Sequence, residues 1–304
     1  MIGLNGSPTC VVTGANGYVG AAITKHLRAR NWNVIPWTRQ RQSSSQGEVY
    51  RLGEDVNPDS LRGVRALVHC AYDFKPRKWD EISAVNVLGS EKLFQAACEA
   101  GVQSIVLISS LSAFEGCRSL YGRAKLQIEG IAQSRGVRVI RPGLVYGKRP
   151  GGVFGRLSEQ VKNSRFVPSL WGGRQVQYLV HVEDLGNLIL GCLNGQVPDN
   201  AGPVSIAHEQ GLELKEILLN IACTLRKRVT LVPVPWRLVW LGLKALELAN
   251  IPTEFRSDSL LGMVYQNPSP SFALLKSLGF QCRPFQISSL TFLAQTDLPV
   301  ERER

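Results

Sequence analysis

Tyr121 and Lys125 are two side chains that could transfer a proton together. They stand four residues apart in a helix-like segment, Leu120–Ser134, so both would lie on one face of that helix. A tyrosine with its ordinary pKa of about 10 is a poor base near neutral pH, and a neighbouring ammonium group lowers that pKa by favouring the phenolate. Because a YxxxK pattern is common by chance, a third polar group is needed. Ser109 and Ser110, at the end of an apolar strand-like run, supply a hydroxyl.

A glycine-rich turn near the start of the chain has the spacing of a phosphate cradle. The segment TGANGYVG, from Thr13 to Gly20, directly follows an apolar strand-like run and opens a helix-like one. Gly14 permits a tight turn, Gly17 lets the backbone approach a pyrophosphate, and Gly20 lets helix and strand pack closely. The amides at the helix start favour an anion. This context predicts a dinucleotide site.

The end of the second expected strand bears on which dinucleotide binds. An NAD site usually has an acidic residue there, which accepts hydrogen bonds from the ribose hydroxyls. Here Thr38 stands at that place, followed by Arg39 and Arg41. A guanidinium suits a ribose 2′-phosphate. NADP(H) is therefore favoured, and NAD(H) is the alternative if Arg39 simply points into solvent.

Short apolar strands alternate with helical segments through the first half, which indicates a parallel sheet covered on both faces. The expected strands are Thr9–Thr13, Asn33–Thr38, Glu48–Leu52, Ala66–Cys70, Ser104–Ser109 and Val137–Arg141. The expected helices are Tyr18–Arg30, Trp79–Ala100 and Leu120–Ser134. The predicted fold class is α/β: a doubly wound parallel Rossmann sheet with a smaller, mostly helical C-terminal substrate lobe.

We predict that residues 1–147 form the NAD(P)-binding Rossmann domain, that the chain returns to it at about 176–206, and that residues 148–304 form the substrate-binding lobe. In the second part, Val176–Val182 reads as a strand, and Leu212–Leu225 and Trp236–Leu248 read as helices. The apolar spacing of Trp236–Leu248 is typical of a core or substrate-lid helix, with a membrane-surface helix as the alternative.

Composition narrows the function classes. The 304 residues carry a net charge of +11, but the basic residues are scattered, and no nucleic-acid-binding signature accompanies them. We expect no nucleic-acid partner and read the charge as attraction for a phosphate-bearing cofactor and an anionic small-molecule substrate. The seven widely spaced cysteines predict neither a disulfide framework nor a metal site. The start of the chain lacks a signal-peptide pattern, and no long apolar run occurs, so we expect a cytoplasmic protein that is not associated with a membrane.

The sequence resembles the extended short-chain dehydrogenase/reductase group, the NAD-dependent epimerase/dehydratase family, over nearly its whole length. Besides TGANGYVG and YGRAK, the matching segments are EDV at Glu54–Val56, HCAY at His69–Tyr72, VNVLGSEKLFQAA at Val85–Ala97, VLISS at Val106–Ser110, RPGLVYG at Arg141–Gly147 and VHVEDL at Val180–Leu185. Their number and order make the resemblance specific.

The resemblance implies a role for particular residues. Ser110 would be the catalytic hydroxyl, because Phe114 four residues later occupies the tyrosine place of the family's usual VYG. Tyr121 would be the general acid/base, and Lys125 would hold the nicotinamide ribose and lower the pKa of the tyrosine. Asn86 would support the proton relay. The implied cofactor-binding set is Gly14, Asn16, Gly17, Tyr18, Val19, Gly20, Thr38, Arg39, Asp55, Val56, Cys70, Ala71, Tyr72, Asn86, Ser109, Tyr121, Lys125, Pro142, Gly143, Leu144 and Val145.

Three departures from the family pattern bear on the activity. Ser110-Leu111-Ser112 stands where the dehydratases carry Thr-Asp-Glu, so dehydration is disfavoured. Gln177 stands where many sugar-nucleotide epimerases carry an arginine for the substrate pyrophosphate, which Arg174 could replace. The interval from Ser110 to Tyr121 is also short for the group.

We expect an oxidoreductase that moves a hydride between a nicotinamide and a carbonyl or secondary alcohol, on a substrate such as a nucleotide-linked sugar. One alternative is a nucleotide-sugar 4-epimerase with a retained NAD, and another is a non-catalytic NADP-sensing regulator. The resemblance also implies a homodimer formed through the helices Trp79–Ala100 and Leu120–Ser134. His69 is expected to be a buried structural residue, as are His181 and Asp184.

Overall fold

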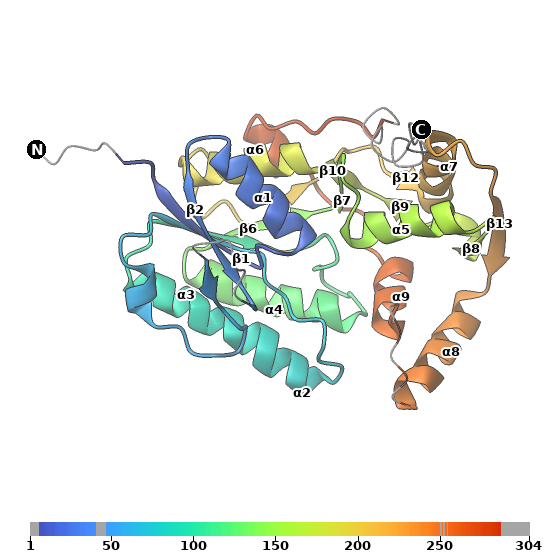
Figure 1. The fold of residues 1–304 in the computed structure, drawn as a ribbon, viewed down its shortest axis with the longest axis horizontal. Coiled ribbons are helices and arrows are strands. Elements are labelled where there is room, and N and C mark those ends of the chain that lie inside the picture. The colour runs from blue at the N-terminus through green and yellow to red at the C-terminus, as the bar shows by residue number, and fades with distance from the viewer. Residues whose placement is uncertain (1–5, 41–46, 250, 252, 254, 287–304) are drawn as a thin grey trace, which may run out of the picture. The chain divides into compact units, whose positions relative to one another are not determined.

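A seven-stranded parallel sheet organises the first of two compact units (Figure 1). The computed structural model describes residues 6–40, 47–249, 251, 253 and 255–286. The strand order is β11-β6-β5-β4-β1-β2-β3, and every neighbouring pair is parallel. The strands are β1 (Thr9–Thr13), β2 (Asn33–Thr38), β3 (Glu48–Val49), β4 (Ala66–His69), β5 (Ser104–Ile108), β6 (Arg138–Pro142) and β11 (Val204–Ile206). This is the predicted Rossmann sheet.

Helices cover both faces of this sheet, which explains why its central strands are apolar throughout. Every residue of β4 and of β5 is buried. Helices α1 (Tyr18–Arg28) and α6 (Val182–Leu193) pack together on one face, and α3 (Gly89–Glu99) packs with α4 (Leu120–Ser134) on the other (Figure 1). This unit also contains η1 (Pro58–Leu61) and α10 (Ala273–Ser277).

The expected single helix over Trp79–Ala100 is interrupted. It consists of a short α2 (Trp79–Ile82), a π-helical segment η2 (Ser83–Leu88) and then α3. A π-helical turn holds an extra residue, and such turns often occur at functional sites. Here the wide turn contains Asn86, whose side chain is fully buried.

The centre of the sheet is a topological switch point. From β1 the chain proceeds outward to β2 and β3, whereas from β4 it proceeds the opposite way to β5 and β6. Ligands of open α/β sheets bind in the crevice at the carboxyl ends of the strands at such a point. Gly14 follows β1 there and Cys70 follows β4, so the switch point lies at the predicted cofactor segments.

The second unit comprises the described residues of 144–181, 207–264 and 282–286. It contains three two-stranded sheets besides its helices, whereas the sequence predicted one strand there. The strands pair as β7 (Leu144–Tyr146) with β10 (Leu179–His181), β9 (Val176–Gln177) with β12 (Leu212–Glu213), and β8 (Phe166–Leu170) with β13 (Thr230–Val234). The helical elements are α5 (Gly152–Asn163), η3 (Trp171–Gly173), α7 (Leu214–Thr224), α8 (Trp236–Leu248) and α9 (Ser257–Val264).

The helix α8 has the predicted bounds but not the predicted burial. None of its residues is buried, and Leu238, Leu241 and Leu248 are exposed, so its interpretation as a core helix is wrong. Within the described residues, no helix has the length and apolar character needed to cross a bilayer. The seven cysteines are free thiols.

Candidate active site

The glycine-rich turn is shaped by close backbone contacts. Gly14 has a φ of +65°, which favours glycine, and a Cβ there would lie 2.9 Å from both the amide nitrogen and the Cα of Ala71. A Cβ on Gly20 would collide with the carbonyl oxygen of Gly14. The turn can therefore pack against the segment after β4 only with glycine at position 14, and α1 can pack against the turn only with glycine at position 20.

The start of α1 fits a phosphate group. Gly17 is its N-cap and offers no side-chain cap, and the first turn contains no acidic residue. Amides in the first turn of a helix have no acceptor within that helix, so they can bind an anion. The donor set at the switch point thus suits the pyrophosphate of a dinucleotide.

His69 is a structural residue, as predicted. It is fully buried, and its Nδ1 lies 2.7 Å from Thr13 Oγ1 while its Nε2 lies 3.0 Å from Ser90 Oγ. Ser90 donates its hydroxyl to the Asn86 carbonyl at 2.6 Å, so Ser90 accepts from His69 Nε2 and Thr13 donates to Nδ1. Burial lowers the pKa of His69 to about 3, with the charge of Lys125 adding to the effect, and the ring is therefore neutral.

The same chain of hydrogen bonds shapes the loop after β4. Thr13 Oγ1 accepts from the amides of Cys70 and Ala71, at 3.2 and 3.3 Å. The Asn86 side chain accepts from the Asp73 amide at 2.8 Å and donates to the Asp73 carbonyl at 3.1 Å. Asn86 thus fixes the backbone of this loop from within the π-helical segment.

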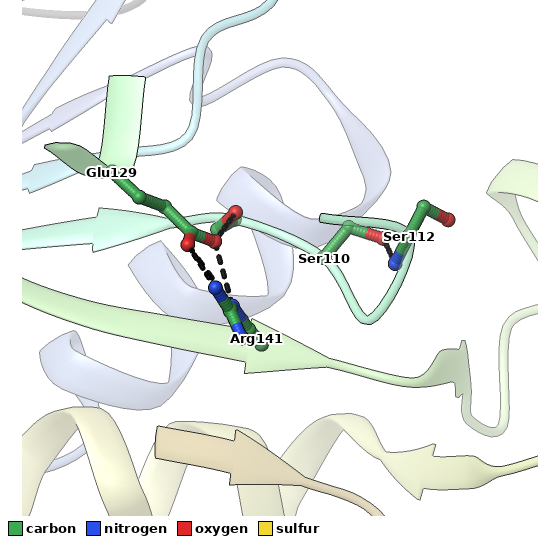
Figure 2. Close-up of polar contacts among 5 residues, drawn as sticks. Ser110, Ser112, Glu129 and Arg141 are labelled. Atoms are coloured by element: carbon green, nitrogen blue, oxygen red, sulfur yellow. Dashed lines mark hydrogen bonds and ion pairs between the residues drawn. The ribbon is translucent and has the colours of Figure 1, made fainter. Parts of the chain in front are cut away.

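The three predicted catalytic residues come together at the carboxyl end of β5. Ser110 follows that strand, and its hydroxyl oxygen accepts from the Ser112 amide at 3.1 Å (Figure 2). Ser119 caps α4 by accepting from the Gly122 amide at 3.0 Å, which places Tyr121 in the first turn of the helix. Ser110 is hydrogen-bonded to Tyr121. One turn later, the buried ammonium of Lys125 donates to the Ile108 carbonyl at 2.9 Å.

Electrostatics at these residues follow mainly from burial. Burial raises the pKa of Tyr121 to about 12, against the lowering effect of the Ser110 hydrogen bond, and the charge of Glu129 raises it further. Burial lowers the pKa of Lys125 to about 8, while Cys70 and Glu129 act in the opposite direction. The expected lowering of the tyrosine pKa by Lys125 is not seen here, since the pKa of Tyr121 lies above its ordinary value. The ammonium instead donates to Ile108 and lies 5.2 Å from the centre of the Tyr72 ring.

An aromatic cluster around Tyr121 was not predicted as a unit from the sequence. The ring of Phe74 stacks on that of Tyr121 at a centroid distance of 5.6 Å, and Tyr72 meets Tyr121 edge-on at 4.9 Å. Phe74 remains 61% exposed. Only the fold of the loop after β4 brings these rings together, and the residue spacing gives no signal for it.

A buried ion pair next to the catalytic residues was also missed. Arg141 of β6 donates to both carboxylate oxygens of Glu129, and Ser109 donates its hydroxyl to the same carboxylate (Figure 2). The position of Glu129, four residues after Lys125, was the available signal.

Other predicted cofactor residues lie around the switch point or at its edge. Thr38 is buried and donates its hydroxyl to the Gln40 carbonyl at 2.7 Å. Arg39 is mainly exposed and pairs with Asp73, whereas Arg41 lies outside the described residues. Asp55 pairs with Lys92 at 2.7 Å.

The remaining predicted cofactor residues lie against the sheet core, at the end of β6 and in β7. Val56 packs against the sheet core. Pro142 ends β6, and the Gly143 amide donates to the Ile206 carbonyl at 3.0 Å. Leu144 and Val145 begin β7 of the second unit.

The chain is similar in sequence to known proteins. The family model described as "NAD dependent epimerase/dehydratase family" matches residues 10–203. The UDP-glucose 4-epimerase of Vibrio cholerae is 25% identical over 261 residues, which are 74% of this chain and 78% of that protein. A UDP-2-acetamido-2,6-beta-L-arabino-hexul-4-ose reductase of Pseudomonas aeruginosa is 27% identical over 222 residues, covering 68% of this chain and 55% of the reductase.

A solved structure shares the fold. MoeE5 in complex with UDP-glucuronic acid and NAD superposes with a TM-score of 0.73 at 21% identity, over 95% of this chain and 100% of MoeE5.

Proposed function

The chain belongs to the NAD-dependent epimerase/dehydratase family, and we propose that it is an NADP(H)-dependent oxidoreductase acting on a carbonyl or secondary alcohol. The observation that carries this proposal is the arrangement of three residues. Ser110 is hydrogen-bonded to Tyr121, and Lys125 lies one helical turn further with its ammonium fixed to Ile108. This is the constellation needed for proton transfer to a substrate oxygen.

Each residue has a distinct task in the proposed reaction. The hydroxyl of Ser110, whose oxygen accepts from the Ser112 amide, turns its single proton from Tyr121 to the substrate oxygen when the substrate binds. Tyr121, protonated at neutral pH because burial raises its pKa to about 12, gives its proton to the same oxygen. Lys125, one helical turn from Tyr121, is proposed to contribute a positive charge that stabilises the phenolate as it develops. The bound nicotinamide supplies or accepts the hydride at the substrate carbon.

The cofactor preference is proposed from Arg39. Its guanidinium lies beyond the carboxyl end of β2, where dinucleotide-binding folds bind the adenosine ribose. It can form charged hydrogen bonds with a 2′-phosphate. The NAD named for MoeE5 belongs to that protein, and we propose NADP(H) for this chain.

For the substrate we propose a nucleotide-linked sugar. The named relatives act on, or bind, UDP-linked sugars. Ser112 stands where an acidic catalytic residue would be needed for dehydration, which favours reduction over water elimination. We also propose residues 148–304 as the substrate-binding lobe, with the chain returning to the cofactor domain at about 176–206.

A 4-epimerase is the second candidate, favoured by the Vibrio cholerae relative. It would oxidise and re-reduce one substrate with a retained NAD. The non-catalytic sensor is disfavoured because Ser110, Tyr121 and Lys125 are all present and assembled.

The test is turnover by the purified protein. We expect consumption of NADPH with UDP-4-keto-hexoses and slower consumption of NADH. Conversion of UDP-glucose to UDP-galactose without added cofactor, together with NAD released from the denatured protein, would instead identify the epimerase. NADPH binding without either reaction would identify the sensor.

A further inference from the structure

We infer that Glu129 is a positioning residue for the reaction proposed above, and that it acts by fixing the catalytic helix α4 to the carboxyl ends of β5 and β6. The inference rests on the proposed function. The geometric evidence consists of the contacts of the buried Glu129 carboxylate, a group to which we assign no catalytic or cofactor-binding role.

Glu129 shares one face of α4 with both proton-transfer residues. Tyr121, Lys125 and Glu129 follow one another at intervals of four residues, so their side chains lie along the same side of the helix. The Glu129 side chain is 1% exposed, and its carboxylate is therefore wholly inside the protein. A buried carboxylate must be paired to remain charged.

The hydrogen-bond partners of the Glu129 carboxylate come from β6 and from the segment just after β5. Arg141 Nε lies 2.9 Å from Oε1 and 3.0 Å from Oε2 of Glu129, and Arg141 Nη2 makes a further bond to Oε2 (Figure 2). The Ser109 hydroxyl donates to Oε1. Ser109 precedes the catalytic Ser110, so one carboxylate joins the helix of Tyr121 to the segment of Ser110.

A gain in the free energy of unfolding does not explain why this buried ion pair is present. The desolvation of two buried charges offsets most of their attraction, and apolar side chains of similar volume often stabilise a protein as well. What a forked guanidinium–carboxylate pair supplies is direction, because two nearly parallel bonds fix the planes of both groups. Near a reacting centre, a misplacement of about 1 Å can cost roughly 100-fold in rate.

The charge of Glu129 also reaches the catalytic groups. It raises the pKa of both Tyr121 and Lys125. Among the described neighbours at the end of β4 and just after it, His69 is neutral and Cys70 is protonated near pH 7, because burial lowers the pKa of the former to about 3 and raises that of the latter to about 12. Asp73, in the loop after β4, pairs with Arg39, while Arg141 of β6 partly offsets the charge of Glu129.

Three single variants test the inference. Ser109→Ala removes the bond to the β5 segment and leaves the ion pair in place, whereas Glu129→Gln removes the charge. Glu91→Gln is the matched control, because Glu91 pairs with Arg135 at the other end of α4, at 3.0 Å. Since Glu129→Gln leaves Arg141 without a carboxylate, the double variant Glu129→Gln/Arg141→Met is made beside it.

We expect kcat to fall roughly 10- to 100-fold in Ser109→Ala, Glu129→Gln and the double variant. The Kd for NADPH should stay within about threefold in Glu129→Gln and in the double variant, because the glycine-rich turn is unaltered. In Glu91→Gln, kcat should stay within about twofold. A kcat within about twofold of wild type in Glu129→Gln would overturn the inference, and so would an equal fall in Glu91→Gln.

A second measurement does not depend on turnover. The pKa of Lys125 is followed by NMR of lysines labelled at Cε, with Lys125→Met identifying the signal. The pKa of Lys125 should fall in Glu129→Gln, because the carboxylate that stabilises the ammonium is gone. It should be unchanged in Ser109→Ala and in Glu91→Gln. If the wild-type protein reduces no carbonyl compound, the proposed function fails, and this titration still decides whether Glu129 acts on Lys125. An unchanged pKa in Glu129→Gln overturns that coupling.

Discussion

The guanidinium of Arg39 lies 3.6 Å from the carboxylate of Asp73. Arg39 follows β2 and Asp73 follows β4, the two strands on either side of β1 and its glycine-rich turn. The residue that we propose to read a 2′-phosphate is thus paired with a carboxylate in this structure. A phosphate group and Asp73 would compete for the same guanidinium.

Arg39→Ala and Asp73→Asn should therefore have opposite effects on cofactor affinity. Arg39→Ala should weaken NADPH by about 1–3 kcal/mol, the range of a hydrogen bond to a charged group, and leave NADH nearly unchanged. Asp73→Asn should tighten NADPH, and its backbone bonds to Asn86 do not depend on the carboxylate. Isothermal titration with both dinucleotides measures this. Equal losses for NADPH and NADH in Arg39→Ala would show that Arg39 does not contact the 2′-phosphate.

His69 should make the protein sensitive to acid. Its pKa is lowered to about 3 in the folded state, so the unfolded state binds the additional proton between about pH 6.5 and pH 3. The free energy of unfolding should fall as the pH falls through this window, by up to about 1.4 kcal/mol per pH unit from this residue. Urea unfolding at several pH values compares wild type with His69→Gln. The variant should be less stable at pH 7, because its bonds to Thr13 and Ser90 change, and should lose stability less steeply below pH 6.5. Parallel curves would contradict the assignment.

The elements whose bounds the sequence predicts most closely are the strands that are buried on both faces. β1 has the expected bounds, and the wholly buried β4 and β5 end within one residue of theirs, because their apolar runs have no other stable placement than the inside of a parallel sheet. The short strands β7, β8, β11 and β13 were not predicted. Each is three to five residues long, and β8 and β13 pair across some sixty intervening residues. β7 and β11, with three residues each, are too short to show a periodicity, and β8 and β13 contain a proline and exposed residues in place of a continuous apolar run.

In the candidate site too, features set by local spacing were predicted and features set by the packing of separate elements were not. The proton-transfer pair was found because Tyr121 and Lys125 lie on one helix, where spacing determines direction. The pairing of Glu129 with Arg141, and of Asn86 with Asp73, depends on how separate elements pack, which spacing does not determine. The exposure of α8 was missed because its apolar periodicity indicates a helix but not what covers it.

The predicted homodimer can be tested at Leu88. This side chain is 49% exposed at the end of the π-helical segment, within the helices expected to form the interface. A buried charge at an apolar interface is costly, so Leu88→Arg should shift the protein from dimer to monomer in light scattering at micromolar concentrations. Leu248→Arg is the control, since Leu248 is 84% exposed on α8 of the other unit. A wild-type protein with a monomeric mass would refute the dimer directly.

Lys125 should set the alkaline limit of the reaction. Burial lowers its pKa to about 8, so its ammonium is present below that pH and lost above it. Tyr121, with a pKa raised to about 12, stays protonated over the same range. The rate of carbonyl reduction should therefore be nearly constant below pH 8 and decline as the pH rises through it. A pH profile of kcat that stays flat to pH 10 would show that the charge of Lys125 does not contribute.

Tyr121→Phe and Lys125→Ala should separate proton transfer from cofactor binding. Tyr121→Phe removes only the hydroxyl, and the ring keeps its contacts with Tyr72 and Phe74. A positioned acid/base group contributes about 10²–10⁴-fold to rate, so kcat should fall by that order while the Kd for NADPH stays within a few-fold. Lys125→Ala should lower both rate and NADPH affinity, because we propose that the lysine also touches the nicotinamide ribose.

Arg123→Ala is the control on the same helix for this pair of variants. Its guanidinium lies over the Trp79 ring at 4.1 Å and has no proposed role in the reaction, so kcat should be unchanged. If Tyr121→Phe keeps most of its activity, the proton must come from another group. Ser110 would then be the first to replace by alanine, because it is the hydroxyl that already bonds to Tyr121.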